Sequence, residues 1–544
     1  MPSRRLLAGV VAALLGLAAC QVSKPPPILP GAATPSQLLR VAVAALPAST
    51  DPALTPPYDS GVARTAFEAL LKPRAGLTDV QPAGAASYEV SSDGLTYTFH
   101  LQPHGAWSDG VPVRAQDFVL GWRRILDPRI NSPVADLFAQ RIKNAAAYAE
   151  LDPKKDAARI PAFLDGLGLK AADDRTFVVQ LDHAAPDFKW ITSVPAGAPA
   201  RADAPAGGAR PGNGPFHLES AGKESIVLAA NLHYWAGRPH LDKIVLNLRG
   251  DATADLTRFL TGGEEMTTVP QAMTWPVTRD PGLSRNLVKV PLLGQAWAQF
   301  NVHRPPFDNA GVRLAFAQAI DRDQLLSDVL LSTLADNPAV PSVGPVPQGL
   351  RDYRPALAAQ RFDTTGSKAT LAASGAGSAS LTGIRLLVRS LPLDLAVATS
   401  IAAQVKQHLG VELTIDARPS PAVSAALQKG DFQVQAPGGW LADYPDEQNF
   451  LDLFRTEDFS QWSRYSSAGF DHLVGQADGE PDPARRLQLY AQAQQLLAQE
   501  APVAFLYQPE AWNLKQPQVR GATYTAIDGW PGDLFAADLS IAPR

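Results

Sequence analysis

The sequence is poor in cysteine and has no apolar run long enough to cross a membrane as a helix. Cys20 is the only cysteine among 544 residues, so no disulfide can form within the chain, and a secreted fold of this size depends on its core. The apolar run at residues 6–19 is shorter than the ~20 residues that a membrane-spanning helix needs. A disulfide within the chain is excluded, and a membrane-spanning helix over residues 6–19 is disfavoured by its length.

Charge and catalytic motifs are also scarce. Charged residues make up 19% of the chain and the net charge is −5, with no long basic run, so we expect no nucleic-acid partner. The sequence has no HExxH, CxxC, GxSxG or phosphate-binding GxxxxGK[ST] motif. His100 and His104 fall on a predicted strand and turn, where their spacing does not share a helix face. We expect no metal and no cofactor. A secreted hydrolase using carboxylates that are distant in sequence stays open as an alternative.

The remaining composition is that of a multidomain globular protein. Hydrophobic residues make up 46%, and the 48 prolines and 41 glycines indicate many loops. At ~150 residues per domain, the length predicts about three to four domains, or fewer large ones.

The N-terminus has the pattern of a secretory signal. Arg4 and Arg5 precede the apolar run, as in signal peptides. The run ends in LAAC at Cys20, which resembles the lipobox of bacterial lipoproteins. That resemblance implies a signal peptide at residues 1–19, cleavage before Cys20 and acylation of its thiol. The alternative is a plain signal peptide, or a short anchor, with an incidental cysteine. Residues 20–36 are rich in proline and predict an extended, lipid-anchored linker.

Hydrophobic periodicity predicts an α/β fold. Strands are expected near residues 38–46, in hairpins at 88–101 and 216–231, and at 297–302 and 503–508. Helices are expected at 61–72 and 310–331. Residues 384–390, 395–410 and 411–418 read as strand, helix and strand, with Gly410 as the helix C-cap. This order is a βαβ unit, which indicates a parallel sheet in the C-terminal half.

Four segments in order resemble one known family. They occupy residues 97–135, 212–244, 300–326 and 439–450; the last reads GWLADYPDEQNF. Together they resemble the extracytoplasmic solute-binding proteins of the oligopeptide/dipeptide ABC transporter family (family 5), across residues 38–544. The resemblance implies two α/β lobes joined by two hinge strands, with an extra inserted domain. It places lobe I at 37–82, 197–295 and 509–544, the inserted domain at 83–196, and lobe II at 296–508.

The resemblance also implies a ligand site around GWLADYPDEQNF. Asp443 would pair with the free α-amino group of a peptide, and the backbone around Gly439 and Trp440 would add a strand to it. A desolvated ammonium needs a charged acceptor, and aromatic walls add cation–π attraction. The alternative is that Asp443 is a solvated charge at the rim. The other residues expected to line the site are Leu441, Tyr444, Tyr58 and Tyr507.

One departure from the family pattern affects the ligand. Peptide binders that fix peptide length carry an Arg just before the Gly-Trp pair, whereas this chain reads QVQAPGGW, and Lys429 is the nearest cation. Either backbone and water hold the peptide's C-terminus, or the ligand is not a peptide of fixed length. The N-terminal loop at residues 50–60 also lacks the family's acid before its tip.

The function that this resemblance implies is ligand capture without chemistry. The chain would be the substrate-binding component of an ABC importer, a monomer in the periplasm or cell envelope, anchored to a membrane through its N-terminal lipid. It would deliver oligopeptides to a permease and its ATPase subunits. The alternative within the same fold is a non-peptide solute: a nickel chelate, haem, an opine or an oligosaccharide.

Overall fold

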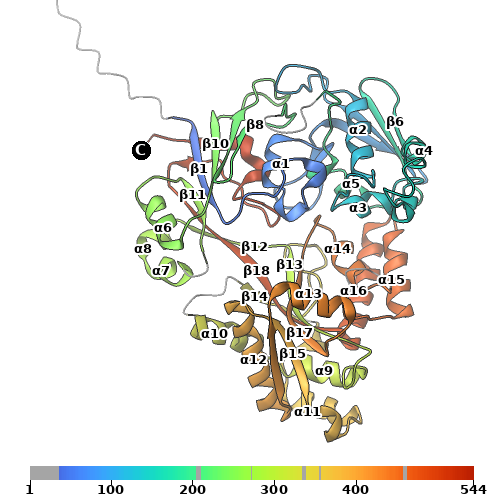
Figure 1. Cartoon of the computed structure of the whole chain (residues 1–544), viewed down its shortest axis with the longest axis vertical. Coiled ribbons are helices and arrows are strands. Elements are labelled where there is room, and N and C mark those ends of the chain that lie inside the picture. The colour runs from blue at the N-terminus through green and yellow to red at the C-terminus, as the bar shows by residue number, and fades with distance from the viewer. Residues whose placement is uncertain are drawn as a thin grey trace, which may run out of the picture.

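A computed structural model describes residues 36–203, 210–270, 273–333, 339–354, 357–456 and 462–543. Figure 1 shows two lobes, an upper and a lower one, connected by strands that run between them. Cys20, with the predicted signal peptide and nearly all of the predicted linker, lies outside these residues. None of the helices in the described part of the chain is long and apolar enough to cross a membrane.

The upper lobe contains a mixed sheet in the strand order β11-β1-β10-β9-β8. Strand β1 is parallel to both β10 and β11, whereas β8, β9 and β10 form antiparallel neighbours. The bounds are β1 (Leu38–Val43), β8 (Phe216–Ala221), β9 (Ser225–Ala230), β10 (Lys243–Leu248) and β11 (Met266–Thr268). The helices on this side are α1 (Gly61–Ala66), α6 (Ala252–Leu260), α7 (Thr274–Arg279) and α8 (Pro281–Ser284).

A four-stranded antiparallel sheet forms the other side of the upper lobe, in the order β4-β5-β7-β6. Its bounds are β4 (Ala85–Val90), β5 (Thr96–Leu101), β6 (Leu169–Ala171) and β7 (Thr176–Gln180). Helices α2 (Ala115–Ile125), α3 (Ala135–Ala139), α4 (Ile160–Gly166) and α5 (Phe188–Ile191) accompany it. Phe99, Trp122 and Phe177 are buried here, in one core shared with β1 and β10.

The lower lobe contains the βαβ unit that the sequence predicts. Strands β15 and β16 pair in parallel, and the helix between them ends at Gly410 with φ +71°. The bounds are β14 (Ala339–Pro341), β15 (Ile384–Arg389), α12 (Pro392–Leu409), β16 (Leu413–Arg418) and β17 (Val434–Leu441). The other helices are α9 (Ala310–Gln318), α10 (Arg322–Thr333), α11 (Thr364–Ala373), α13 (Ser420–Lys429), α14 (Gln448–Leu451), α15 (Ala468–Asp478) and α16 (Pro483–Glu500).

Two adjacent antiparallel strands connect the lobes, as the resemblance implies. They are β13 (Gly294–Phe300) and β18 (Val503–Lys515). The first half of β18 pairs with β13 and β14, and the second half pairs with β11 and β12 (Leu287–Pro291). One strand therefore belongs to the sheets of both lobes, and Figure 1 shows it crossing between them.

Two predicted helices are wrong in extent. The helix expected at 61–72 ends at Ala66, because the backbone carbonyls of Ala69 and Leu70 accept hydrogen bonds from Gly84 and Ala85 instead. The chain then forms the short strand β2 (Leu71–Pro73), which pairs with β3 (Val80–Pro82). The helix expected at 310–331 is two helices, α9 and α10, because Asp321 interrupts it and caps the second one by accepting from the N–H of Gln324.

Candidate functional site

The end of strand β17 offers an open edge. On one side β17 pairs with β13 from Leu441 back to Val434, but β15 contacts it only at Val434 and Gln435. The N–H of Ala442 donates to Leu293 of the segment leading into β13. Because successive residues of a strand alternate in direction, Gly439 and Leu441 direct their N–H and C=O groups away from β13. Both residues are exposed, so this edge can receive another extended chain.

Glycine is required at this edge because β13 approaches closely. A Cβ at Gly439 would lie 2.6 Å from the carbonyl oxygen of Gln295, and one at Gly438 would lie 3.0 Å from Nε1 of Trp297. The pair of glycines therefore keeps the edge flat and close to β13, which is consistent with strand addition.

Asp443 lies just beyond the open edge of β17. Asn449 holds it: the Asn449 Oδ1 accepts from the backbone N–H of Asp443 at 2.9 Å and from Nε1 of Trp440 at 3.1 Å. Desolvation raises the pKa of Asp443 to about 6, although a hydrogen bond from Asn449 opposes the shift. Among the residues that the structure describes, no Lys, Arg or His forms an ion pair with Asp443. A partly buried carboxylate without a cation is suited to accept one from a ligand.

A cavity of about 400 Å³ lies beside the same edge. Gly438, Gly439 and Trp440 form one wall of it, and large apolar side chains form others, namely Trp297, Phe454, Trp462 and Leu427. A chain added to the edge of β17 would therefore have a space of mostly apolar character for its side chains.

Arg389 supplies a positive charge in this cavity, and the sequence-based prediction missed it. It is the last residue of β15, it lines the cavity, and its side chain is 42% exposed while it pairs with Asp394. The nearest cation in sequence, Lys429, is instead an exposed residue at the end of α13. The signal in the sequence was the position of Arg389 at the carboxyl end of a parallel strand, where ligand sites of α/β sheets form.

The other predicted site residues are separated by the fold. Trp440 lines the cavity, and Leu441 is 42% exposed on the open edge. Tyr507 is buried in the lower-lobe core, where desolvation and the charge of Asp394 raise its pKa to about 12. Tyr58 lies in the short 3-10 helix η2 (Pro57–Asp59), and its side chain lies outside the described part of the chain. Their role as ligand contacts stays a prediction.

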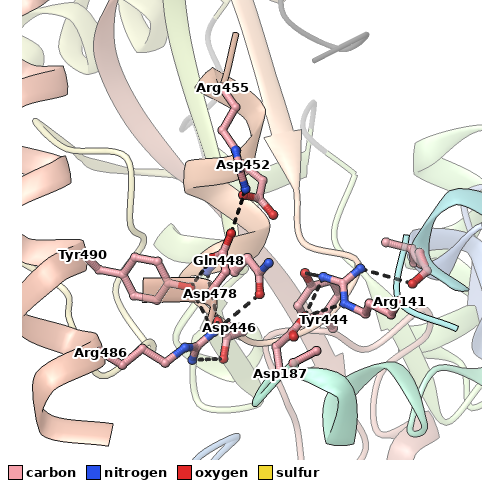
Figure 2. Close-up of polar contacts among 12 residues, drawn as sticks. Arg141, Asp187, Tyr444, Asp446, Gln448, Asp452, Arg455, Asp478, Arg486 and Tyr490 are labelled. Atoms are coloured by element: carbon pink, nitrogen blue, oxygen red, sulfur yellow. Dashed lines mark hydrogen bonds and ion pairs between the residues drawn. The ribbon is translucent and has the colours of Figure 1, made fainter. Parts of the chain in front are cut away.

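Tyr444 points away from the open edge. Its side chain is 2% exposed, and its hydroxyl accepts a hydrogen bond from Nη2 of Arg141, a residue of the upper lobe, at 3.2 Å. Figure 2 shows this contact, with Arg141 also paired to Asp187. Residues 439–450, which carry Asp443, are called the anchor segment below. Tyr444 therefore attaches this segment to the upper lobe in this structure.

A second buried network holds the same segment to the lower lobe. Asp446 accepts two hydrogen bonds from Arg486 of α16, at 2.9 and 2.8 Å, and both side chains are almost fully buried. Arg486 also donates to the hydroxyl of Tyr490, which donates to Asp478. Figure 2 shows these groups beside the Arg141 contact. In the described ranges, no group of three or more His, Cys, Asp or Glu side chains is placed to hold a metal ion.

Two lobes joined by paired strands, an open strand edge with a cavity beside it in the lower lobe, and a carboxylate that forms no ion pair with any described residue define a two-lobed binding protein. The chain belongs to family 5 of the bacterial extracellular solute-binding proteins, whose middle region matches residues 79–462. It is therefore placed in an extracytoplasmic family of binding proteins.

Relatives and a solved structure agree with this assignment. The dipeptide-binding protein DppE of Bacillus subtilis is 31% identical over 460 residues, which are 81% of each chain. The probable deoxycholate-binding periplasmic protein YgiS of Escherichia coli is 29% identical over 458 residues, covering 82% of this chain and 83% of the relative. The unliganded open form of the murein tripeptide binding protein MppA superimposes with a TM-score of 0.77 at 26% identity, covering 94% of this chain and 98% of that one.

Proposed function

We propose that this chain is the substrate-binding component of an ABC importer and that it captures peptides with a free N-terminal amino group. The observation that carries this proposal is the Asp443 carboxylate, which lies at the end of an open strand edge and forms no ion pair with a cation in the described part of the chain. Relatives named as peptide binders support the choice of ligand. The protein releases the peptide to a membrane permease, and no bond of the ligand is broken.

Binding would proceed by strand addition. The outward N–H and C=O groups of Gly439 and Leu441 pair with the backbone of an extended peptide, which gives affinity without reading its side chains. The peptide's ammonium reaches Asp443 at the end of this ladder. The two lobes then close as a population shift, because the closed state makes contacts that the open state lacks.

The domain division follows the crossing strands. We assign residues 37–82, 197–295 and 509–544 to lobe I, residues 83–196 to the inserted domain and residues 296–508 to lobe II. The separate antiparallel sheet of β4 to β7 and the passage of β13 and β18 between the lobes support these boundaries.

Arg389 would hold the peptide's terminal carboxylate in place of the arginine that this sequence lacks. We expect Arg389→Met to weaken tri-alanine binding by about 1.5–3 kcal/mol, since it removes a charged hydrogen bond. The same variant should bind C-amidated tri-alanine as the unmodified protein does, because that ligand has no carboxylate. Isothermal titration calorimetry with both ligands measures this, and Lys429→Met is the matched control for loss of a nearby cation. An equal loss for both ligands would place Arg389 outside the carboxylate site.

A second candidate ligand is an apolar carboxylic acid of the bile-acid type. The cavity pairs apolar walls, Trp297, Phe454 and Trp462, with a single arginine, and one relative carries the name of a probable deoxycholate-binding protein. Titration with sodium deoxycholate separates the two ligands. Asp443→Asn should leave deoxycholate binding unchanged, because this ligand has no ammonium, whereas it should weaken peptide binding.

The location of the protein in the cell envelope would depend on Cys20, which the resemblance to a lipobox implies is the acylated residue. We expect the anchored protein to be a monomer. We expect Cys20→Ser to abolish labelling of the chain by palmitate and to remove it from the membrane fraction, because the thiol carries the lipid. Metabolic labelling followed by fractionation measures both effects. Label that still enters the mutant chain would contradict the assignment.

A further inference from the structure

The side chain of Tyr444 belongs to the core of the opposite lobe. It follows Asp443 in the sequence, and the segment around it belongs to the lower lobe, because it continues from β17 and Asp446 pairs with Arg486 of α16. Ala442 packs in a mixed cluster with Phe450 of the lower lobe and with Leu77 and Leu293 of the upper lobe. Tyr444 itself packs in the hydrophobic cluster of the upper lobe, whose other members among the described residues all come from that lobe. One side chain therefore links the two lobes next to the ligand anchor.

Arg141 fixes the hydroxyl of Tyr444 in the upper lobe (Figure 2). Its guanidinium is held by three other hydrogen bonds: Nε and Nη2 donate to Asp187 at 3.0 and 2.6 Å, and Nη1 donates to the carbonyl of Leu137 at 3.1 Å. The side chains of Arg141 and Asp187 are 4% and 1% exposed. Because a guanidinium is planar and presents its donors in a fixed fork, these bonds also determine where the hydroxyl of Tyr444 lies.

Asp443 thus lies between two fixed points that belong to different lobes. On one side Asn449 of the lower lobe accepts from the backbone N–H of Asp443 at 2.9 Å. On the other side Tyr444 is held by Arg141 of the upper lobe at 3.2 Å. A movement of the lobes relative to each other changes the distance between these points, and with it the position of the carboxylate.

A polar cavity of about 410 Å³ adjoins this contact. Arg141 and Asp187 line it from the upper lobe, and Asp452, Arg455 and Asp478 line it from the lower lobe. The contact between Arg141 and Tyr444 therefore borders a cavity in which residues of the two lobes face each other.

We propose that Arg141 is a positioning residue for ligand binding. By holding the hydroxyl of Tyr444 in the upper lobe, it sets the position of the Asp443 carboxylate, and Asp187 in turn orients Arg141. Neither Arg141 nor Asp187 contacts the ligand. The inference rests on the proposed function, in which Asp443 binds the ligand's ammonium.

The test removes only the hydroxyl. Tyr444→Phe keeps the buried ring and should weaken the binding of tri-alanine about five- to tenfold in calorimetric titration. Tyr234→Phe is the matched control, because Tyr234 is also buried and its hydroxyl also forms a hydrogen bond, to Glu68 of the upper lobe at 2.7 Å, outside the two networks that hold residues 439–450. It should change the affinity less than twofold. Equal losses in the two variants would make the effect a general one of removing a buried hydroxyl and would overturn the proposal.

A double-mutant cycle tests whether Tyr444 acts through Arg141. Arg141→Lys keeps the charge beside Asp187 but cannot make the same set of hydrogen bonds. If the two residues act together, Tyr444→Phe should weaken tri-alanine binding in the wild type but have almost no further effect in Arg141→Lys. Losses that multiply independently would overturn the coupling.

A measurement without ligand separates this proposal from the proposed function. In hydrogen exchange of the full-length protein, Tyr444→Phe should raise the exchange rate of residues 440–449 severalfold, and Tyr234→Phe should leave that segment unchanged. If the wild type fails to bind tri-alanine, the peptide function is wrong, but faster exchange in Tyr444→Phe alone still supports the positioning contact. Identical exchange in all three proteins overturns it.

Discussion

Asp443→Asn is expected to weaken the binding of tri-alanine by about 2–5 kcal/mol while the protein stays folded. The change is nearly isosteric, but it leaves the ligand's ammonium in the closed cleft without its charged partner. The ligand-free variant should be as stable as the wild type at pH 7 or more so, because burial of an ionised carboxylate without a cation is unfavourable and the pKa of Asp443 is raised to about 6 by desolvation. Calorimetric titration and thermal denaturation measure the two effects.

N-acetylated tri-alanine provides the matched ligand. Acetylation removes the ammonium, so the wild type should bind this ligand poorly, and Asp443→Asn should discriminate much less between the two forms. The four affinities form a cycle in which the interaction energy of the carboxylate with the ammonium is measured directly. If acetylation and the mutation cost additive amounts, the two groups do not interact, and Asp443 is a charge at the rim of the site.

The affinity for tri-alanine should also depend on pH, because both groups of the proposed ion pair must be charged. The carboxylate must be ionised to accept the ammonium, so the affinity should fall as the pH drops through about 6, the raised pKa of Asp443, at a limit of about tenfold per pH unit. It should also fall above pH ~8, where the free ligand's α-amino group loses its proton. Asp443→Asn should lack the acid limb and show a much weaker basic limb, because the preference for the ammonium over the neutral amine comes from the carboxylate.

Asp446→Asn is expected to lower the free energy of unfolding by about 3–5 kcal/mol. Asp443→Asn, by contrast, should not destabilise the ligand-free protein. Asp446 and Arg486 are 1% and 6% exposed in their side chains, and removal of one partner leaves the other charge buried and unpaired. Burial alone would lower the pKa of Arg486, but the charge of Asp446, the hydrogen bond to it and the neighbouring Tyr490 together outweigh burial, and the pKa is raised. Urea denaturation at pH 7, followed by circular dichroism, measures the loss.

A double variant tests whether the loss of stability comes from leaving one charge buried and unpaired. Replacing both partners, in Asp446→Leu with Arg486→Met, removes the charges together and should recover much of the lost stability. Asp443→Asn, the same substitution three residues away, should show no such destabilisation. If the two single Asn variants unfold at the same urea concentration as the wild type, the ion pair does not stabilise this lobe.

The sequence by itself determined the family and the elements of the fold. Alternating and amphipathic patterns predicted the hairpins, the βαβ unit with Gly410 and the two strands that cross between the lobes, and the structure has them. These features are local, because they follow from side-chain period and turn residues. The helix expected at 61–72 was wrong in extent because its end depends on contacts outside the helix. The carbonyls of Ala69 and Leu70 accept hydrogen bonds from Gly84 and Ala85, which lie about 15 residues further along the chain.

Only the tertiary structure decided the chemistry of the site. Asp443 and Asp446 stand in one short stretch, GWLADYPDEQNF, and nothing local distinguishes them. Packing of α16 brings Arg486, 40 residues further along the chain, to Asp446, whereas no cation of the described residues pairs with Asp443. Likewise, Arg389 reaches the cavity and Tyr444 enters the opposite lobe through contacts between distant segments. Charge pairing depends on distance in space, and the order of residues alone does not determine that distance.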